Sequence, residues 1–124
     1  MRGHRDLLVW QKAMVLVIDI YRATCDFPRH ELYGLISQLR RAAVSIPSNL
    51  AEGHARNSKN EFRQFVGQAR GSLCDLETQV EIAKTLHYME VDVANDMLER
   101  IAELGRMLTG LRSWCSGEKL IPNC

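Results

Sequence analysis

Apolar residues recur every three or four positions along four stretches of the chain, and this period is typical of amphipathic helices. The pattern predicts helices over about residues 7–25, 31–53, 59–87 and 91–114. No stretch alternates apolar and polar residues as a half-buried strand does. Short connections force neighbouring helices to run in opposite directions. The sequence therefore predicts an all-α, antiparallel up-down four-helix bundle in one domain, with a flexible tail over residues 116–124.

The first predicted helix carries apolar residues on more than one side. Asp6 is its expected N-cap, since a carboxylate there accepts a free backbone N–H. One apolar stripe is widened by two further residues, and together they are Trp10, Met14, Val17, Tyr21, Leu16 and Ile20. The second apolar side is a candidate interface between subunits.

The third predicted helix has the clearest start signal and the most regular apolar seam. Ser58 and Glu61 have the spacing of a capping box, in which the hydroxyl and the carboxylate each accept a free backbone N–H. Apolar residues follow at alternating spacings of four and three, a heptad pattern. They are Phe62, Val66, Ala69, Leu73, Leu76, Val80 and Ala83.

The second predicted helix contains Pro47, which removes one backbone hydrogen bond and costs about 3 kcal/mol inside a helix. We expect the helix to bend there and to end at Gly53 as a C-cap. Folding the second helix onto the third about Arg56 places Ser45 opposite Gly67 and also Arg41 opposite Gly71. Small residues at these crossings would let the two backbones approach closely.

Several polar residues lie along the same pair of helices. They are interpreted either as a structural polar network, with Asn49 opposite Arg63, or as the lining of a ligand pocket. Glu77 belongs to the network because neighbouring Arg41 and Arg70 need a carboxylate or phosphate nearby. The set is Ser45, Asn49, Glu52 and Glu77.

The charges are balanced overall but unevenly distributed along the chain. Net charge is +1, yet residues 1–72 carry 11 Lys/Arg against 6 Asp/Glu, and residues 73–124 carry 5 against 9. Basic residues fall along one side of the third helix and on the adjacent second helix: Arg56, Lys59, Arg63 and Arg70, with Arg40 and Arg41. They are either solvated or paired with the acidic fourth helix across subunits, or they form a phosphate-binding surface multiplied by oligomerisation.

No residue pattern indicates a reaction. The order Glu-x-x-His, which di-iron bundles use on paired helices, is absent. No arginine precedes a histidine at the four-to-six spacing expected of helical-bundle ribonucleases. The four scattered cysteines form no framework and indicate reduced thiols in the cytoplasm. We therefore expect no metal, no cofactor and no enzymatic activity, and no membrane span, since the longest apolar runs fall far short of about 20 residues.

Three segments together resemble a known family: VWQKA, ELYGLISQLRRAAVSIPSNLAEG and EFRQFVGQARGSLCDLETQ. They are similar to the four-helix bundle proteins named after intervening sequences in 23S ribosomal RNA genes. The resemblance covers about residues 7–114 and implies an up-down bundle that assembles into a barrel-like homopentamer. The family is also similar to accessory proteins of diversity-generating retroelements, which bind a reverse transcriptase and nucleic acid through a basic surface. No enzymatic activity is established for the family.

These observations favour a non-catalytic oligomeric scaffold acting through a basic surface, with nucleic acid or a nucleic-acid enzyme as its partner. The residues expected to contact phosphates are Arg40, Arg41, Arg56, Lys59, Arg63 and Arg70. Two alternatives stay open. One is a purely structural homo-oligomer that binds no nucleic acid, and the other is a bundle with a metal or small-molecule site between its helices.

Overall fold

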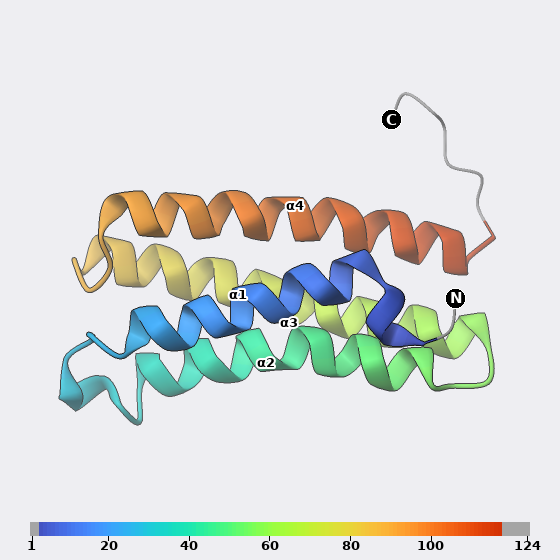
Figure 1. Cartoon of the computed structure of the whole chain (residues 1–124), viewed down its shortest axis with the longest axis horizontal. Coiled ribbons are helices and arrows are strands. Elements are labelled where there is room, and N and C mark those ends of the chain that lie inside the picture. The colour runs from blue at the N-terminus through green and yellow to red at the C-terminus, as the bar shows by residue number, and fades with distance from the viewer. Residues whose placement is uncertain (1–2, 118–124) are drawn as a thin grey trace.

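Four long helices account for most of the computed structural model, which describes residues 3–117. They are α1 (Leu8–Thr24), α2 (Leu35–His54), α3 (Lys59–Thr85) and α4 (Val91–Cys115), with short 3₁₀ turns η1 (His4–Asp6) and η2 (Arg29–Glu31). Successive helices run in opposite directions along a common axis (Figure 1). The described residues contain no strand. The predicted all-α four-helix bundle is confirmed, and most of the predicted tail lies outside the described residues.

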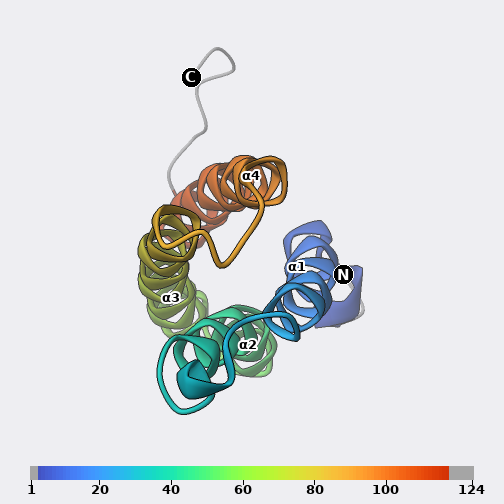
Figure 2. The same ribbon diagram turned by 90° about the vertical axis from the view of Figure 1, so that its left-hand side faces the viewer.

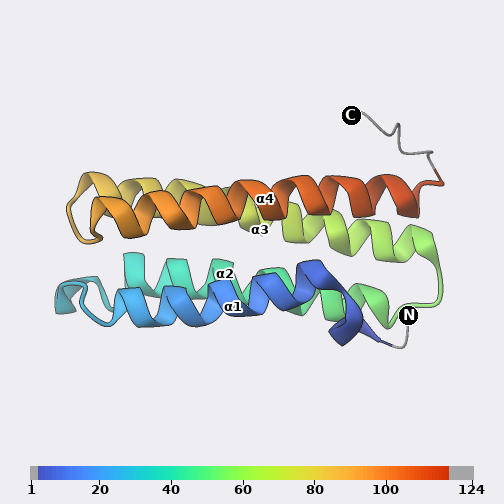
Figure 3. The same ribbon diagram turned by 45° about the horizontal axis from the view of Figure 1, so that its top comes forward.

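The helices are arranged as two hairpins whose inner faces share one core. α1 lies beside α2 and α3 beside α4 (Figure 3), and seen along the axis the helices follow one another in chain order around the core (Figure 2). The largest fully buried side chains come from every helix, among them Ile20, Leu50, Leu76 and Leu108. α2 packs most extensively on α3, while α1 and α4 make the sparsest contact. The interface between α1 and α4, which closes the bundle, is therefore its weakest apolar interface.

The buried face of α1 is rotated from the predicted stripe. Its centre is formed by Leu16 and Ile20, which were predicted to lie at the edge of the stripe. Met14 and Tyr21, which were predicted to belong to the stripe, are exposed. The N-cap is Leu7, not the predicted Asp6, which lies in η1. The rotation follows from packing, because α1 rests mainly on α2 and needs only one deeply buried stripe. The rest of its apolar surface faces outward.

The ends of α2 differ from the prediction for local reasons. Helix α2 begins at Leu35 instead of near residue 31, because η2 occupies the predicted start and Gly34 has a non-helical backbone. It continues through Pro47, which is buried, and past Gly53 to His54. Gly53 is therefore not the predicted C-cap. It lies inside the helix, on the side that meets α3.

Gly53 is the point of closest approach between α2 and α3. A Cβ atom placed there would lie 2.5 Å from Phe65 Cβ and 3.0 Å from Phe62 Cδ1. The same atom on Gly67 or Gly71 would meet nothing within 4 Å, so the predicted close approach at those two glycines is wrong. The two helices fold back about a later residue than Arg56, because α2 runs on to His54.

The start of α3 is capped as predicted. Ser58 Oγ accepts a hydrogen bond from the Glu61 backbone N–H at 3.1 Å, which satisfies one of the free donors of the first turn. The helix ends at Thr85 instead of near residue 87, because His87 adopts φ 63° in the turn to α4. This left-handed backbone reverses the chain direction within a few residues.

Charged side chains bridge α1 and α4 where apolar packing is thin. Lys12 pairs with Glu103, and Asp19 Oδ2 accepts a hydrogen bond from Arg100 Nη1 at 2.8 Å. The hydrogen bond from Lys12, reinforced by its charge, holds the pKa of Glu103 below its ordinary value of 4.5. These pairs are partly exposed, so each contributes little by itself. Together they fix the register of α1 against α4.

We predict opposite stability changes for two glycine-to-alanine substitutions. Gly53→Ala forces a methyl group against Phe65 and should destabilise the fold by about 1–3 kcal/mol. Gly67→Ala adds a methyl group in open space and should stabilise it by about 1 kcal/mol through helix propensity. Urea unfolding followed by circular dichroism measures both. A change of the same sign in both variants would contradict the assigned register.

We predict that the α1–α4 bridge weakens in acid. Because the folded-state pKa of Glu103 lies below its ordinary value, its contribution is present above about pH 4.5 and is lost as the pH falls through the folded value. The stability difference between the wild-type chain and Glu103→Gln should therefore be constant near neutral pH and vanish in acid. Thermal unfolding between about pH 3 and pH 7 tests this. A difference independent of pH would rule out an ionic origin.

Candidate nucleic-acid interface

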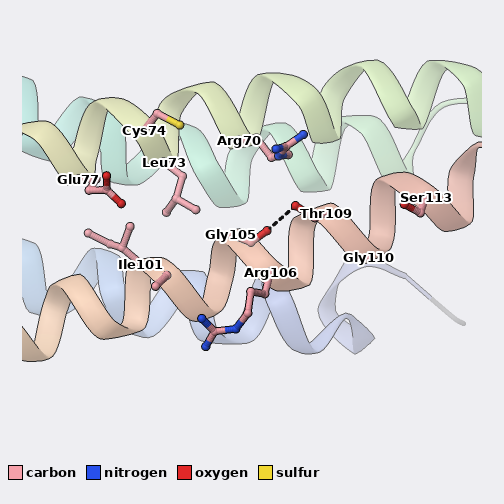
Figure 4. A pocket seen from close by; sticks show the side chains of 11 residues that line it. Arg70, Leu73, Cys74, Glu77, Ile101, Gly105, Arg106, Thr109, Gly110 and Ser113 are labelled. Carbon is pink, nitrogen blue, oxygen red and sulfur yellow. Dashed lines mark hydrogen bonds between the residues drawn. The ribbon is translucent and has the colours of Figure 1, made fainter. Parts of the chain in front are cut away.

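A groove runs between the middle of α3, over residues 70–77, and residues 101–113 of α4, which lie side by side because the two helices are antiparallel (Figure 4). Its volume is about 620 Å³. Arg70 and Thr109 face each other across it, while Arg106 extends away from α3 (Figure 4). The full lining is Arg70, Leu73, Cys74, Glu77, Ile101, Ala102, Gly105, Arg106, Thr109, Gly110 and Ser113. We call this feature the α3–α4 groove.

The floor of the groove is apolar and lacks a side chain at its centre. Gly105 lies opposite Leu73, and a Cβ there would sit 3.6 Å from Leu73 Cδ2, an ordinary contact distance. Glycine inside a helix costs about 1 kcal/mol relative to alanine. Packing alone therefore does not require a glycine at this position. Its effect is to leave the groove open.

Three arginines converge at one end of the groove. The described lining of a smaller cavity there, of about 190 Å³, consists of Arg63, Arg70, Thr109, Arg112, Ser113 and Ser116, and none of these residues carries a carboxylate. We call this cavity the arginine pocket. Within residues 3–117, these three arginines form no ion pair. Among the described residues, the pocket is a concentrated positive site.

Two of these guanidinium groups have an unmet hydrogen-bonding requirement. Arg63 Nε and Arg112 Nε are both buried, and neither has a hydrogen-bond partner in the described part of the chain. A buried polar group without a partner costs about 1–3 kcal/mol, and more when it is charged. Both residues line the arginine pocket, so an anion bound there would lie beside these guanidinium groups.

Other side chains keep this end of the molecule basic. Lys59 Nζ lies 4.1 Å from the centroid of the exposed Trp114 ring. Burial raises the pKa of the Cys115 thiol, and nearby Lys59 and Arg63 oppose that rise. The start of α3 and the end of α4 thus carry cations from both helices.

The acidic residues of α4 do not neutralise the pocket. They lie between the start and the middle of α4, and among them Asp96 pairs with Arg100 and Glu103 pairs with Lys12. The acidic residue of the groove itself, Glu77, is two helical turns from Arg70, or about 10 Å along the axis. Such a separation is comparable to the screening length of about 10 Å in ordinary salt.

The structure brings together only part of the predicted basic surface. Arg63 and Arg70 share the pocket, and Lys59 lies beside it. Arg40 instead lies between α1 and α2, where its Nε donates to Thr24 Oγ1 at 2.9 Å. Arg41 is exposed on α2 and does not line the groove.

Arg56 belongs to the predicted basic surface, whereas Arg112 does not. Arg56 precedes α3, pairs with Glu52 at 3.1 Å and covers the Phe65 ring. Arg112 lines the pocket. It was not predicted as a site residue, because acidic residues outnumber basic ones in the fourth predicted helix. The antiparallel pairing of α3 and α4 was the signal that could have found it.

The predicted polar network is divided among three places. Ser45 Oγ lies 2.8 Å from Ser72 Oγ, and Asn49 Nδ2 donates to Ser45 Oγ at 2.9 Å. This link joins α2 to α3 through Ser72, so the predicted pairing of Asn49 with Arg63 is wrong. Glu52 pairs with Arg56, and Glu77 lies in the α3–α4 groove, so neither belongs to the link.

Among residues 3–117, no group of three or more His, Cys, Asp or Glu side chains is placed to hold a metal ion. No helix in this part of the chain is long and apolar enough to cross a bilayer.

The fold and groove define a four-helix bundle with an arginine-lined groove between its last two helices. The family model for the 23S rRNA-intervening sequence protein matches residues 5–110, and the chain belongs to that family. Its fold is similar to that of a protein of unknown function from the S23 ribosomal protein family of Bacteroides thetaiotaomicron. That similarity has a TM-score of 0.76 at 17% identity and covers 85% of this chain and 98% of the other. No curated protein matches the chain.

Proposed function

We propose that the protein is a non-catalytic homo-oligomeric module that binds the phosphate backbone of nucleic acid through the arginine pocket and the α3–α4 groove. The observation that carries this proposal is the convergence of Arg63, Arg70 and Arg112 in a pocket whose described lining holds no carboxylate. A nucleic-acid enzyme as a further partner rests on the resemblance to retroelement accessory proteins alone.

The proposed binding is electrostatic and reads little sequence. Guanidinium groups contact phosphate oxygens, which position a strand without distinguishing its bases. Phe62 is buried and Phe65 is covered by Arg56, so neither offers a stacking platform beside the groove. Affinity should then come from the release of counterions and decline steeply with salt.

Oligomerisation is supported by the outward face of α1. Leu8, Val15 and Ile18 are 56%, 57% and 46% exposed and lie on the side opposite the core. Burying such residues against a second subunit removes apolar surface from water. Subunit assembly would also repeat a modest phosphate site several times, which raises the avidity for a long polyanion. The number five follows from the family resemblance.

The proposed compartment is the cytoplasm. Cys25, Cys74 and Cys115 are unpaired thiols, and thiols stay reduced where glutathione and thioredoxin operate.

The first test of the proposal is the salt dependence of oligonucleotide binding. With three phosphate contacts per subunit, log affinity should fall against log salt with a slope of about −2 for single strands. Alanine at Arg63, Arg70 or Arg112 should each flatten the slope by about 0.7. Fluorescence anisotropy with labelled RNA and DNA at several salt concentrations measures this.

Arg29→Ala is the matched control, because it removes the same charge from an exposed residue at the opposite end of the bundle. Gly105→Leu provides a second test, since it fills the groove without changing charge. It should weaken binding while leaving the fold intact. Binding that is independent of salt, or equally weakened by Arg29→Ala, would overturn the electrostatic site.

The second candidate function is a purely structural oligomer, favoured by the exposed apolar face of α1. Val15→Glu and Ile18→Glu should dissociate the oligomer, because charge is excluded from an apolar interface. Light scattering at several protein concentrations measures the mass, with Leu32→Glu as the control at another exposed apolar residue. An oligomer that needs α1 but binds no nucleic acid at low salt would establish this second function.

A further inference from the structure

We propose that the arginine pocket receives a terminal phosphomonoester, the phosphorylated end of a nucleic-acid strand, and not an internal phosphodiester. This inference rests on the proposed function and specifies which part of the strand occupies the pocket.

The first argument is size and position. The pocket of about 190 Å³ is below the range of about 300–1,000 Å³ typical of sites that enclose a whole organic ligand. It therefore suits one anionic group. Arg70, Thr109 and Ser113 line both the pocket and the groove of about 620 Å³. A strand whose end occupies the pocket can extend directly into the groove.

The second argument is charge. A phosphomonoester carries about −1.5 to −2 at neutral pH, whereas an internal phosphodiester carries one negative charge. Coulombic attraction scales with the product of the charges. Three guanidinium groups, with no carboxylate among the residues from 3 to 117 that line the pocket, therefore favour the monoester.

The third argument is the supply of hydrogen-bond donors. Each guanidinium has five N–H donors in a rigid fork that matches phosphate oxygens. Arg63 Nε and Arg112 Nε lack partners, and the Ser113 hydroxyl makes no hydrogen bond within the described residues. A monoester presents three terminal oxygens as acceptors, and a diester has only two unbridged oxygens. The monoester satisfies more of the available donors.

The test compares oligonucleotides of one sequence that differ only at their ends. Fluorescence anisotropy is measured for strands with a 5′-phosphate, with a 3′-phosphate and with hydroxyls at both ends. We expect one phosphorylated strand to bind at least about tenfold more tightly than the hydroxyl strand. Arg112→Ala should abolish that preference, and Arg29→Ala should leave it unchanged.

Arg112→Lys guards against a variant that fails to fold. It keeps the positive charge but lacks the bidentate fork, so it should still bind both strands while its preference for the phosphorylated end is reduced and not abolished. Equal affinity for phosphorylated and hydroxyl strands in the wild-type protein would overturn this inference. The proposed function would survive that result if binding remained salt-dependent and sensitive to Arg63 and Arg70.

Free phosphate is the competing source of the same chemistry. Inorganic phosphate and a nucleoside monophosphate are therefore added separately, and thermal unfolding is followed. If either raises the unfolding temperature in an Arg112-dependent way while no oligonucleotide binds, the pocket is a small-anion site. That result would overturn both the strand-end inference and the proposed function. Competition by phosphate that is much weaker than by the phosphorylated strand would support the inference.

Discussion

The close contact between α2 and α3 at Gly53 is the constraint on which the rest of the bundle depends. With no side chain at that position, Phe62 and Phe65 settle directly against the α2 backbone, and the Ser45–Ser72 hydrogen bond lies farther along the same interface. These contacts fix both the register and the rotation of α3. Since one side of α3 packs against α2, the side that carries Arg63 and Arg70 faces α4. The packing of α2 on α3 thereby determines which side chains line the groove between α3 and α4.

The sequence was sufficient for the fold class because its local signals agree with one another. The heptad seam of α3 and the capping box at Ser58 both specify one helix with a defined start, and the structure has the buried seam and the Ser58 hydroxyl bond of the box. Register was harder to predict, because it depends on where a connection turns and not on periodicity. Treating Gly53 as a helix end moved the turn too early and assigned the close approach to Gly67 instead. Glycine ends helices and also admits tight packing, and only the partner helix distinguishes these two uses.

The sequence predicted two of the three arginines of the candidate site. Arg63 and Arg70 are seven residues apart, so their common face on a helix follows from its period. Arg112 could not be grouped with them from composition, because it follows an acidic stretch and lies far away along the chain. Arg40 shows the opposite difficulty, since its exposure was assumed from charge alone. Its guanidinium is held by Thr24 and the Tyr21 ring, and so an apparent surface cation is part of the α1–α2 interface.

The separation of charge along the α3–α4 hairpin gives the molecule an electric dipole along its long axis. Cations gather where α3 begins and α4 ends, while carboxylates gather at the far end of the same hairpin. A nearly neutral protein with this arrangement is a dipole, and the field of a polyanion turns it before the surfaces touch. The acidic end is repelled and trails, so encounters begin with the arginines leading. For the proposed polyanionic partner, this arrangement would orient the approach without requiring a high net charge.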